Sequence, residues 1–220
     1  ILIAQDTDDV NQQVWIDYYM YRIPREDFQF MGDAGFRFLV GGGWKKYIVR
    51  PSLQKGINEW LDLFGGLGFF YTVQDGLSNT LEIRPWIGAR VYLYWDTFRK
   101  IMFSDYFRIE DRIIINTQSS GTSNSIRLRN KISARIPITD QYFADEVLYA
   151  MLSFEFFIDG GDIEELFADK IRLGGGLGYK FNYNWRVEFY FYAFRSQDTA
   201  TSGFTTTDQV WQLTLKHYVD

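Results

Sequence analysis

The chain is built from segments in which apolar and polar residues alternate with a period of two. Between residues 81 and 93 the odd positions are Leu, Ile, Pro, Ala and Val, whereas the even positions are Glu, Arg, Trp, Gly and Tyr. The same alternation runs through residues 28–40, 107–115, 126–136, 171–181 and 185–193. Alternate side chains of a strand point to opposite faces, so the pattern predicts strands with one apolar and one polar face.

The alternating segments are long. Eleven can be marked, at residues 10–22, 27–40, 45–57, 61–74, 80–94, 104–117, 124–138, 147–158, 169–181, 185–196 and 207–219. Strands of soluble proteins cluster near about 5–6 residues, whereas a tilted membrane-spanning strand needs about 9–11. Clusters of Gly, Asn, Asp and Ser separate the segments and predict turns. We therefore predict an all-β fold, an antiparallel transmembrane β-barrel of the outer-membrane type.

The number of marked segments conflicts with the usual rule for such barrels. Single-chain bacterial barrels have an even number of strands, because both termini belong in the periplasm. We therefore expect twelve strands, with ten as the alternative, and place the error in the N-terminal third, where Gly41–Gly43 and Pro51 obscure the register. Residues 1–9 are expected to form an N-terminal segment, and residues 10–220 a single barrel domain.

Alternation alone would also suit a soluble, lipocalin-like barrel that binds an apolar ligand inside. The mean hydropathy is slightly negative, and no apolar run approaches the roughly 18 residues of a spanning helix. However, the apolar face is large on nearly every strand, and the polar face mixes Arg, Glu, Gly and Tyr, as a crowded lumen requires. Aromatic residues make up 19% of the chain, and we expect an interfacial girdle. Its predicted members are Trp44, Trp60, Trp95, Tyr183, Trp185, Trp211 and Tyr218.

The connections predict an orientation in the bacterial outer membrane. If the last strand runs down to the periplasm, four connections are external, at residues 74–79, 118–124, 159–167 and 197–206. Three others are then periplasmic, at residues 96–100, 138–146 and 182–184. The expected surroundings are outer-membrane lipid and, in a larger assembly, other outer-membrane proteins.

Charge and composition exclude several functions. A net charge of −5 argues against nucleic acid as the main partner. The absence of cysteine excludes disulfides and thiol chemistry, and the single histidine, His217, falls on the apolar face near the predicted periplasmic end. The acidic loop at residues 159–165 does not have the spacing of an EF-hand. We therefore expect no enzymatic activity, no metal site and no cofactor.

The predicted lumen is strongly basic. The alternation places thirteen Arg and Lys inside against seven Asp and Glu. The predicted charge network comprises Arg84, Arg90, Arg108, Glu110, Arg112, Arg127, Arg129, Arg135, Glu155, Arg172, Arg186 and Glu188. Buried like charges are costly unless paired, so we expect the glutamates, with Glu82, to join the arginines. Two hypotheses follow, a charge-filled structural or accessory barrel and a small anion-preferring channel.

The same strands resemble a known family. The chain contains Phe107-Arg-Ile-Glu110-Asp-Arg112, then Ile126-Arg-Leu-Arg129, then Ser153-Phe-Glu155-Phe-Phe157, then Lys170-Ile-Arg172-Leu-Gly-Gly-Gly-Leu-Gly178-Tyr179. This order is similar to that of the Bacteroidota outer-membrane proteins catalogued as domain of unknown function 2490, over about residues 80 to 218. The resemblance implies an outer-membrane barrel of a Gram-negative bacterium and supplies no catalytic residues.

Two polar residues break the apolar face. Asp111 and Asn130 fall on the parity predicted to face lipid. If they do point outward, they indicate a patch that a partner protein covers.

Overall fold

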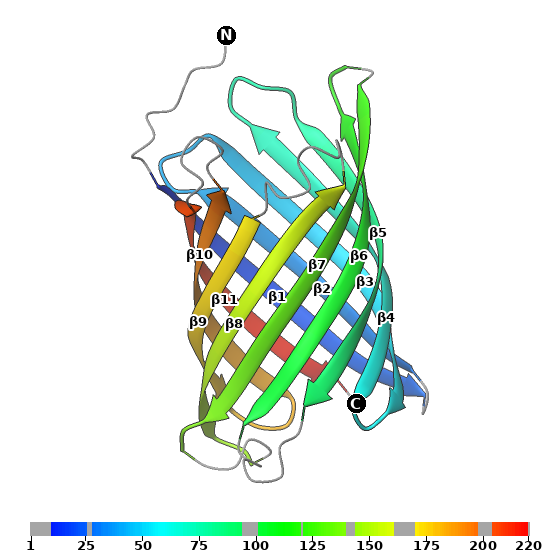
Figure 1. Cartoon of the computed structure of the whole chain (residues 1–220), viewed down its shortest axis with the longest axis vertical. Helices are drawn as coiled ribbons and strands as arrows, with labels where there is room; N and C mark the ends of the chain where they lie inside the picture. The colour runs from blue at the N-terminus through cyan, green and yellow to red at the C-terminus, as the bar shows by residue number, and fades with distance from the viewer. Residues whose placement is uncertain are drawn as a thin grey trace.

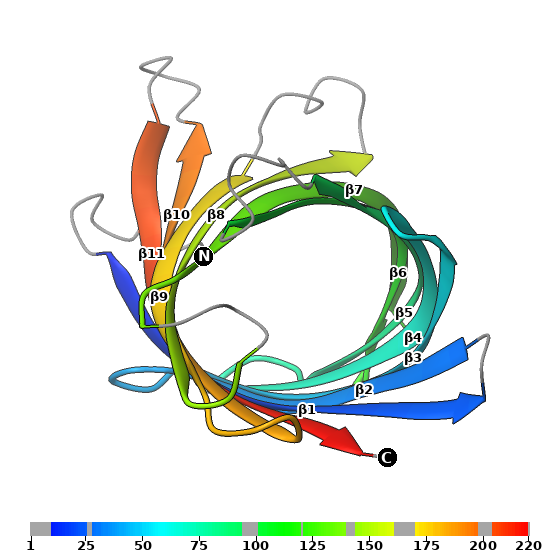
Figure 2. The same cartoon turned by 90° about the horizontal axis from the view of Figure 1, so that it is seen from below.

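The structure is a computed structural model that describes residues 10–25, 28–93, 101–119, 121–139, 144–160, 170–197 and 204–219. These residues form eleven strands that close into one barrel (Figures 1 and 2). The strands are β1 (Asn11–Arg25), β2 (Phe28–Leu39), β3 (Trp44–Asn58), β4 (Leu61–Gln74), β5 (Thr80–Leu93), β6 (Met102–Asn116), β7 (Thr122–Pro137), β8 (Val147–Gly160), β9 (Lys170–Lys180), β10 (Trp185–Gln197) and β11 (Phe204–Val219). Within these ranges no helix is long and apolar enough to cross a membrane.

The strand count corrects the expectation of twelve strands or ten. Each strand pairs antiparallel with its neighbour in the chain, and the barrel closes by pairing β1 with β11 in parallel. The even-number rule assumes that the first and last strands run in opposite directions, and parallel closure removes that condition. Consequently β1 begins at one end of the barrel and β11 ends at the other (Figure 1).

The parallel seam between β1 and β11 is held by side chains as well as by the backbone. Its register runs without a shift from Asn11↔Asp208 to Arg22↔Val219. Gln12 Nε2 donates to Gln209 Oε1 at 2.7 Å, and Gln13 Nε2 donates to Asp208 Oδ1 at 2.7 Å. Parallel pairs are slightly less stable per residue than antiparallel pairs, and these contacts add specificity to the closure.

The two faces of the wall have opposite character. Along β1, Trp15 and Asp17 are 6% and 2% exposed, whereas the intervening Ile16 and the following Tyr18 are 48% and 37% exposed. The buried parity faces the lumen, so the interior is polar and the exterior apolar. Every strand places a large apolar side chain on the surface, among them Ile16, Phe28, Val49, Leu63, Ile87, Ile109, Ile132, Leu152, Leu177, Phe189 and Leu213. This arrangement is that of a transmembrane-type β-barrel.

Glycines on the inner face of β9 make room for aromatic rings. A Cβ added at Gly174 would lie 2.5 Å from both Ser153 Oγ and Tyr192 Cε1. At Gly178 an added Cβ would clash with the ring of Tyr149, which is fully buried. The glycine run is therefore a packing feature, because only hydrogen atoms fit beneath these rings.

The connections alternate between the two ends. Gly41, Gly42 and Gly43 have φ angles of 91°, 101° and 100°, a region that favours glycine. The glycine run in the N-terminal third is therefore a turn between β2 and β3. This turn and the connections after β4 and β6 lie at the end where β1 begins (Figure 1). The turns after β3 and β9 lie at the other end, near the end of β11. Residues 1–9 and most of the predicted connections 96–100 and 159–167 lie outside the described residues.

The seam can be tested with cysteines, because the natural chain has none. Ile16 lies opposite Leu213 in the parallel register. We expect the double variant Ile16→Cys with Leu213→Cys to form an intramolecular disulfide on mild oxidation, seen as a shift on a non-reducing gel. The pair Ile16→Cys with Val219→Cys is the control, since six residues along a strand separate the two by about 20 Å. A twelfth strand between β1 and β11 would prevent the first crosslink.

Candidate functional site

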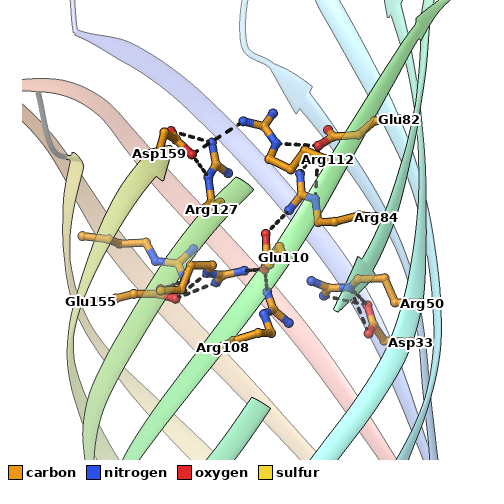
Figure 3. A network of polar contacts seen from close by, with 12 residues as sticks. Asp33, Arg50, Glu82, Arg84, Arg108, Glu110, Arg112, Arg127, Glu155 and Asp159 are labelled. Carbon is orange, nitrogen blue, oxygen red and sulfur yellow. Dashed lines mark hydrogen bonds and ion pairs between the residues drawn. The ribbon is translucent and has the colours of Figure 1, made fainter. Parts of the chain in front are cut away.

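The inner wall of β5 to β9 carries a continuous chain of ion pairs (Figure 3). Glu110, on β6, is at its centre and has no exposed surface. Its carboxylate accepts from Arg84 Nη1 at 3.0 Å and from Arg129 Nη1 at 2.8 Å, and it also pairs with Arg108. One buried carboxylate thus joins three guanidinium groups from three adjacent strands.

The chain continues towards the end of the barrel where β1 begins. Glu82 Oε1 accepts from Arg84 Nη2 at 2.7 Å and from Arg112 Nε at 2.6 Å. Arg127 donates through Nε and Nη2 to the two oxygens of Asp159, at 2.5 and 3.0 Å, and Arg112 Nη1 lies 3.9 Å from Asp159. Arg112 therefore bridges the carboxylates of β5 and β8 across β6 and β7.

The chain also continues sideways around the wall. Arg129 Nη2 donates to Glu155 Oε1 at 2.6 Å, and Arg172, on β9, pairs with Oε2 of the same carboxylate. Because Glu155 is only 2% exposed, both of its oxygens are bound by guanidinium groups away from bulk solvent. Paired in this way, the charges avoid the cost of isolated burial.

Smaller ion pairs lie elsewhere in the lumen. Arg50 donates to both oxygens of Asp33 and, through Nη2, to Tyr19 Oη at 3.2 Å. On the β10–β11 wall, Lys216 Nζ and Tyr149 Oη donate to Glu188 at 2.7 and 2.8 Å. The lumen is therefore cross-braced on several walls.

Aromatic rings support the arginines. The Cζ of Arg84 lies 4.2 Å from the ring centroid of Phe70, and that of Arg108 lies 4.8 Å from Trp86. Arg90 Cζ lies 4.8 Å from the ring centroids of both Phe64 and Tyr106, which contact each other edge to face. Such contacts hold cations in place but leave their charge uncompensated.

A cavity of about 490 Å³ remains in the lumen, and all eleven strands contribute to its lining. Its walls include Arg37, Lys46, Lys131 and Arg172 together with Trp15 and Tyr192. Beside it an apolar cluster packs the inner face of β1, β8, β10 and β11, with members Trp15, Val147, Tyr149, Met151, Tyr190, Tyr192 and Val210. The lumen is thus partly filled, and what space is left is lined by basic groups.

The structure places all twelve predicted network residues on the inner parity. Of these, nine take part in the ion pairs described above, whereas Arg90 stacks on rings and Arg186 lies 4.6 Å from the ring of Tyr218. Arg135 also faces inward, with contacts of its own. Glu188 pairs with Lys216 of β11.

Sequence reasoning missed four charged lumen residues, namely Lys46, Asp159, Asp208 and Lys216. The signal for both lysines was present, because Lys46 shares the parity of Arg50, and Lys216 shares that of the buried Thr214. Asp159 falls in a predicted loop because the predicted strand ends at residue 158, two residues before the end of β8. Asp208 lies within the predicted strand at residues 207–219, on the same parity as the buried Gln212.

The predicted aromatic girdle is wrong in three places. Trp44 lines the lumen cavity and lies 5.7 Å from Lys46 Nζ, and Tyr218 stacks on Tyr21 at 4.6 Å on the inner face. Trp211 points outward but sits in the middle of β11, packed against Phe191. These residues lie near predicted strand ends, but a girdle residue must also point outward and lie at the level of the membrane interface.

Three other residues of the predicted girdle lie in a turn or at a strand end on the outer face. Trp60 and Tyr183 are 52% and 56% exposed, in the turns after β3 and β9. Trp185 stacks on the ring of His217 at 3.9 Å. His217 Nδ1 also shares a hydrogen bond of 2.8 Å with Tyr18 Oη across the seam, so it is a structural contact of the outer face. Trp95 lies outside the described residues.

The outer face of β6 and β7 carries polar groups amid apolar ones. Asn130 Nδ2 donates to Asp105 Oδ1 at 2.6 Å, and Asp111 lies on the same outward parity. Oδ1 of Asp111 is buried and accepts no hydrogen bond. We call Asp105, Asp111 and Asn130 the outer polar trio. Within the described ranges no three or more His, Asp or Glu side chains form a group suited to a metal ion.

Comparison with known proteins gives one family and one structure. A family described as "Protein of unknown function (DUF2490)" matches residues 12–205. No curated protein matches. A solved structure, described as "Structure of the RagAB peptide importer in the 'closed-closed' state", is similar at 8% identity and a TM-score of 0.39. That match covers 84% of this chain and 32% of the other, so this chain spans about a third of its length.

The ion-pair chain should stabilise the barrel through Glu110. We expect Glu110→Gln to lower the free energy of unfolding by about 3–5 kcal/mol, because three guanidinium groups lose their shared buried carboxylate. Unfolding in detergent, followed by near-ultraviolet circular dichroism against denaturant, measures the change. Glu59→Gln, in the exposed turn after β3, is the control and should stay within about 0.5 kcal/mol of the natural chain. Equal effects of the two substitutions would contradict a structural role for the chain of ion pairs.

Proposed function

The chain belongs to the DUF2490 family of proteins of unknown function, and from this premise we propose that it is an integral outer-membrane β-barrel with a charge-filled, closed lumen. In this proposal it serves as a structural or accessory subunit of a larger assembly in the envelope of a Gram-negative bacterium of the Bacteroidota.

The apolar outer face is the observation that carries the membrane placement. Monomeric proteins in water rarely expose contiguous apolar patches of more than a few hundred Å². Here all eleven strands contribute exposed large apolar side chains, with Ile87 64%, Leu152 56% and Val49 54% exposed. Lipid is the solvent that suits this surface, and closed barrels of this kind span outer membranes. The polar interior is the reverse of what a soluble binder of an apolar ligand needs.

A closed lumen is supported by the ion pairs and the apolar cluster together. The ion pairs join β5 through β9, and the apolar cluster fills the adjoining part of the lumen along β8, β10, β11 and β1. Moving these groups aside would leave Glu110 and Glu155 without their buried partners, at a cost of several kcal/mol for each ion. A filled barrel supplies a rigid wall and no permanent path for solutes.

The outer polar trio supports the accessory role. A carboxylate on a face that otherwise meets lipid is costly, and such residues mark functional contacts by default. Beside the trio, the outer face has an apolar hollow of about 540 Å³ lined by small and apolar residues, among them Phe103, Ile132, Ala134 and Gly175. A partner protein with complementary donors would cover both features.

The second candidate is a small anion-preferring channel. The excess of arginine and lysine around the lumen cavity favours it, since rings of basic residues select anions. For either candidate we propose no enzymatic activity and no cofactor, and outer-membrane lipid rather than nucleic acid as the surroundings.

Bilayer recording tests the closed lumen. We expect the folded, heat-modifiable protein to insert into a planar bilayer and to give no stable conductance steps, because the ion pairs hold the lumen shut. The double variant Glu110→Ala with Glu155→Ala, refolded in the same detergent, should conduct if it folds. Stable anion-preferring steps from the natural chain, altered by Arg129→Gln, would favour the channel instead. Natural chain that stays in solution without detergent and never inserts would overturn the membrane placement.

Site-specific crosslinking tests the accessory role. A photo-reactive benzophenone residue at Leu128, between Ile126 and Asn130 on the outer face, should give one discrete adduct in intact outer membranes. The adduct should disappear when Asp111 and Asn130 are both changed to Leu. The same residue placed at Val49, on the outer face of β3, serves as the control. Indistinguishable products from the two positions would contradict a partner surface at the trio.

A further inference from the structure

Three lumen cations lie against a shared aromatic floor, and a fourth lies beside one of them. Arg37 Cζ lies 3.7 Å and Arg172 Cζ 5.9 Å from the ring centroid of Trp15. The Trp15 ring packs on Tyr192 at 6.3 Å between centroids. Arg172 also stacks on Tyr192 at 4.9 Å, and Lys131 Nζ lies 6.0 Å from the same ring. Lys46 lies directly opposite Arg37 in the register of β2 and β3. We call Arg37, Lys46, Lys131 and Arg172 the basic cluster.

The basic cluster is short of negative charge. Among the described residues no carboxylate oxygen lies within 4.0 Å of the Nζ of Lys46 or Lys131. Arg37 reaches Asp17 only at 3.9 Å, and Arg172 shares Glu155 with Arg129. Two like charges directly opposite each other on neighbouring strands destabilise a sheet, and Arg37 with Lys46 is such a pair. The ion pairs of the lumen therefore do not neutralise all of the positive charge of the basic cluster.

Hydrogen-bond donors of the cluster are also unused. The Nε groups of Arg37 and Arg172 are buried and have no hydrogen-bond acceptor in the described structure, and the same is true of the Nε of Arg108 on the facing wall. Arg108 itself is only 8% exposed. Buried donors without acceptors destabilise a fold, and charged ones do so more strongly than neutral ones. Donors that are unsatisfied around a common cavity indicate a missing acceptor.

The cavity that these groups share has the size and charge of an anion site. Its volume of about 490 Å³ falls in the range of small-molecule pockets. Eleven basic and four acidic residues line it. Three further carboxylates, Asp17, Glu110 and Asp159, pair with lining residues from behind, and basic residues still exceed acidic ones by four.

We propose that the basic cluster is a binding site for a small multivalent oxyanion, a free solute that carries phosphoryl or carboxylate groups. Guanidinium groups match the geometry of such oxygens, and the lysines add point charges. The aromatic floor of Trp15 and Tyr192 fixes the arginines while leaving their outward donors available. This site goes beyond the proposed function, since neither a closed structural barrel nor the membrane placement requires it.

Removing an unpaired lysine should weaken anion binding without lowering the stability of the ligand-free protein. We expect inorganic pyrophosphate, titrated into the folded protein in lipid-free detergent micelles, to raise the unfolding temperature more than sodium chloride of equal ionic strength. Lys46→Gln and Lys131→Gln should each weaken binding roughly tenfold, the factor that one charge-assisted hydrogen bond supplies. Without ligand, each variant should unfold at the same temperature as the natural chain or a higher one, because an uncompensated charge has gone.

Lys45→Gln is the matched control. It removes the same charge from the neighbouring position of β3, whose side chain points outward and is exposed. It should bind pyrophosphate like the natural chain. Citrate in a parallel titration separates a preference for carboxylates from one for phosphoryl groups, and binding of either supports the site.

Three results would overturn the site. The first is that pyrophosphate and citrate raise the unfolding temperature no more than sodium chloride does. The second is that Lys46→Gln and Lys131→Gln bind pyrophosphate as tightly as the natural chain. The third is that Lys45→Gln weakens binding as much as Lys46→Gln. Because micelles replace the bilayer, failure here leaves the proposed function intact, and failure of the bilayer recording leaves the site intact.

Discussion

The rest of the structure depends on pairing charges inside a closed wall of strands. A β-strand alternates its side chains, so an exterior made apolar for lipid leaves every second residue to the lumen. In this chain many of those residues are arginines, and burying them is feasible only where carboxylates and aromatic rings meet them. Glu110 and Glu155 do so for four arginines in all, and the strands that carry these groups are thereby fixed relative to one another.

Closure of the barrel follows a different constraint. An edge strand in a membrane has unsatisfied backbone groups, so the first and last strands must pair whatever their directions. With eleven strands the pairing of β1 and β11 is parallel, and Gln12, Gln13 and Tyr18 add side-chain hydrogen bonds across it. The two ends of the barrel wall therefore differ, because one holds the start of β1 and the other the end of β11 (Figures 1 and 2).

Not all of the lumen charge is compensated, and the imbalance is local. On the β5–β9 wall, shared carboxylates pair with Arg84, Arg108 and Arg129, whereas Lys46 on β3 and Lys131 on β7 face the cavity with rings for neighbours. A barrel selected for stability alone would replace them with neutral residues. Keeping them costs free energy of folding, and a bound anion would offset that cost. The ion pairs of β5 to β9 thus suit stabilisation of the barrel, whereas the basic cavity suits binding of an anion.

The pattern of residues along the chain is enough to predict an all-β barrel, strands of membrane-spanning length and which face of each strand meets the lumen. Period-two alternation is a local property, so Arg84, Glu110 and Arg129 could be placed inside without knowing their neighbours. The alternation marked eleven segments, and the wrong expectation of twelve or ten strands came from the even-number rule, because the direction of closure depends on how the first and last strands meet. The folded barrel was needed to learn which carboxylate meets which arginine, that Trp44 and Tyr218 face inward, and that Lys46 and Lys131 form no ion pair among the described residues. These features depend on register between strands far apart in the chain, since a shift of two residues keeps the alternation but exchanges every partner.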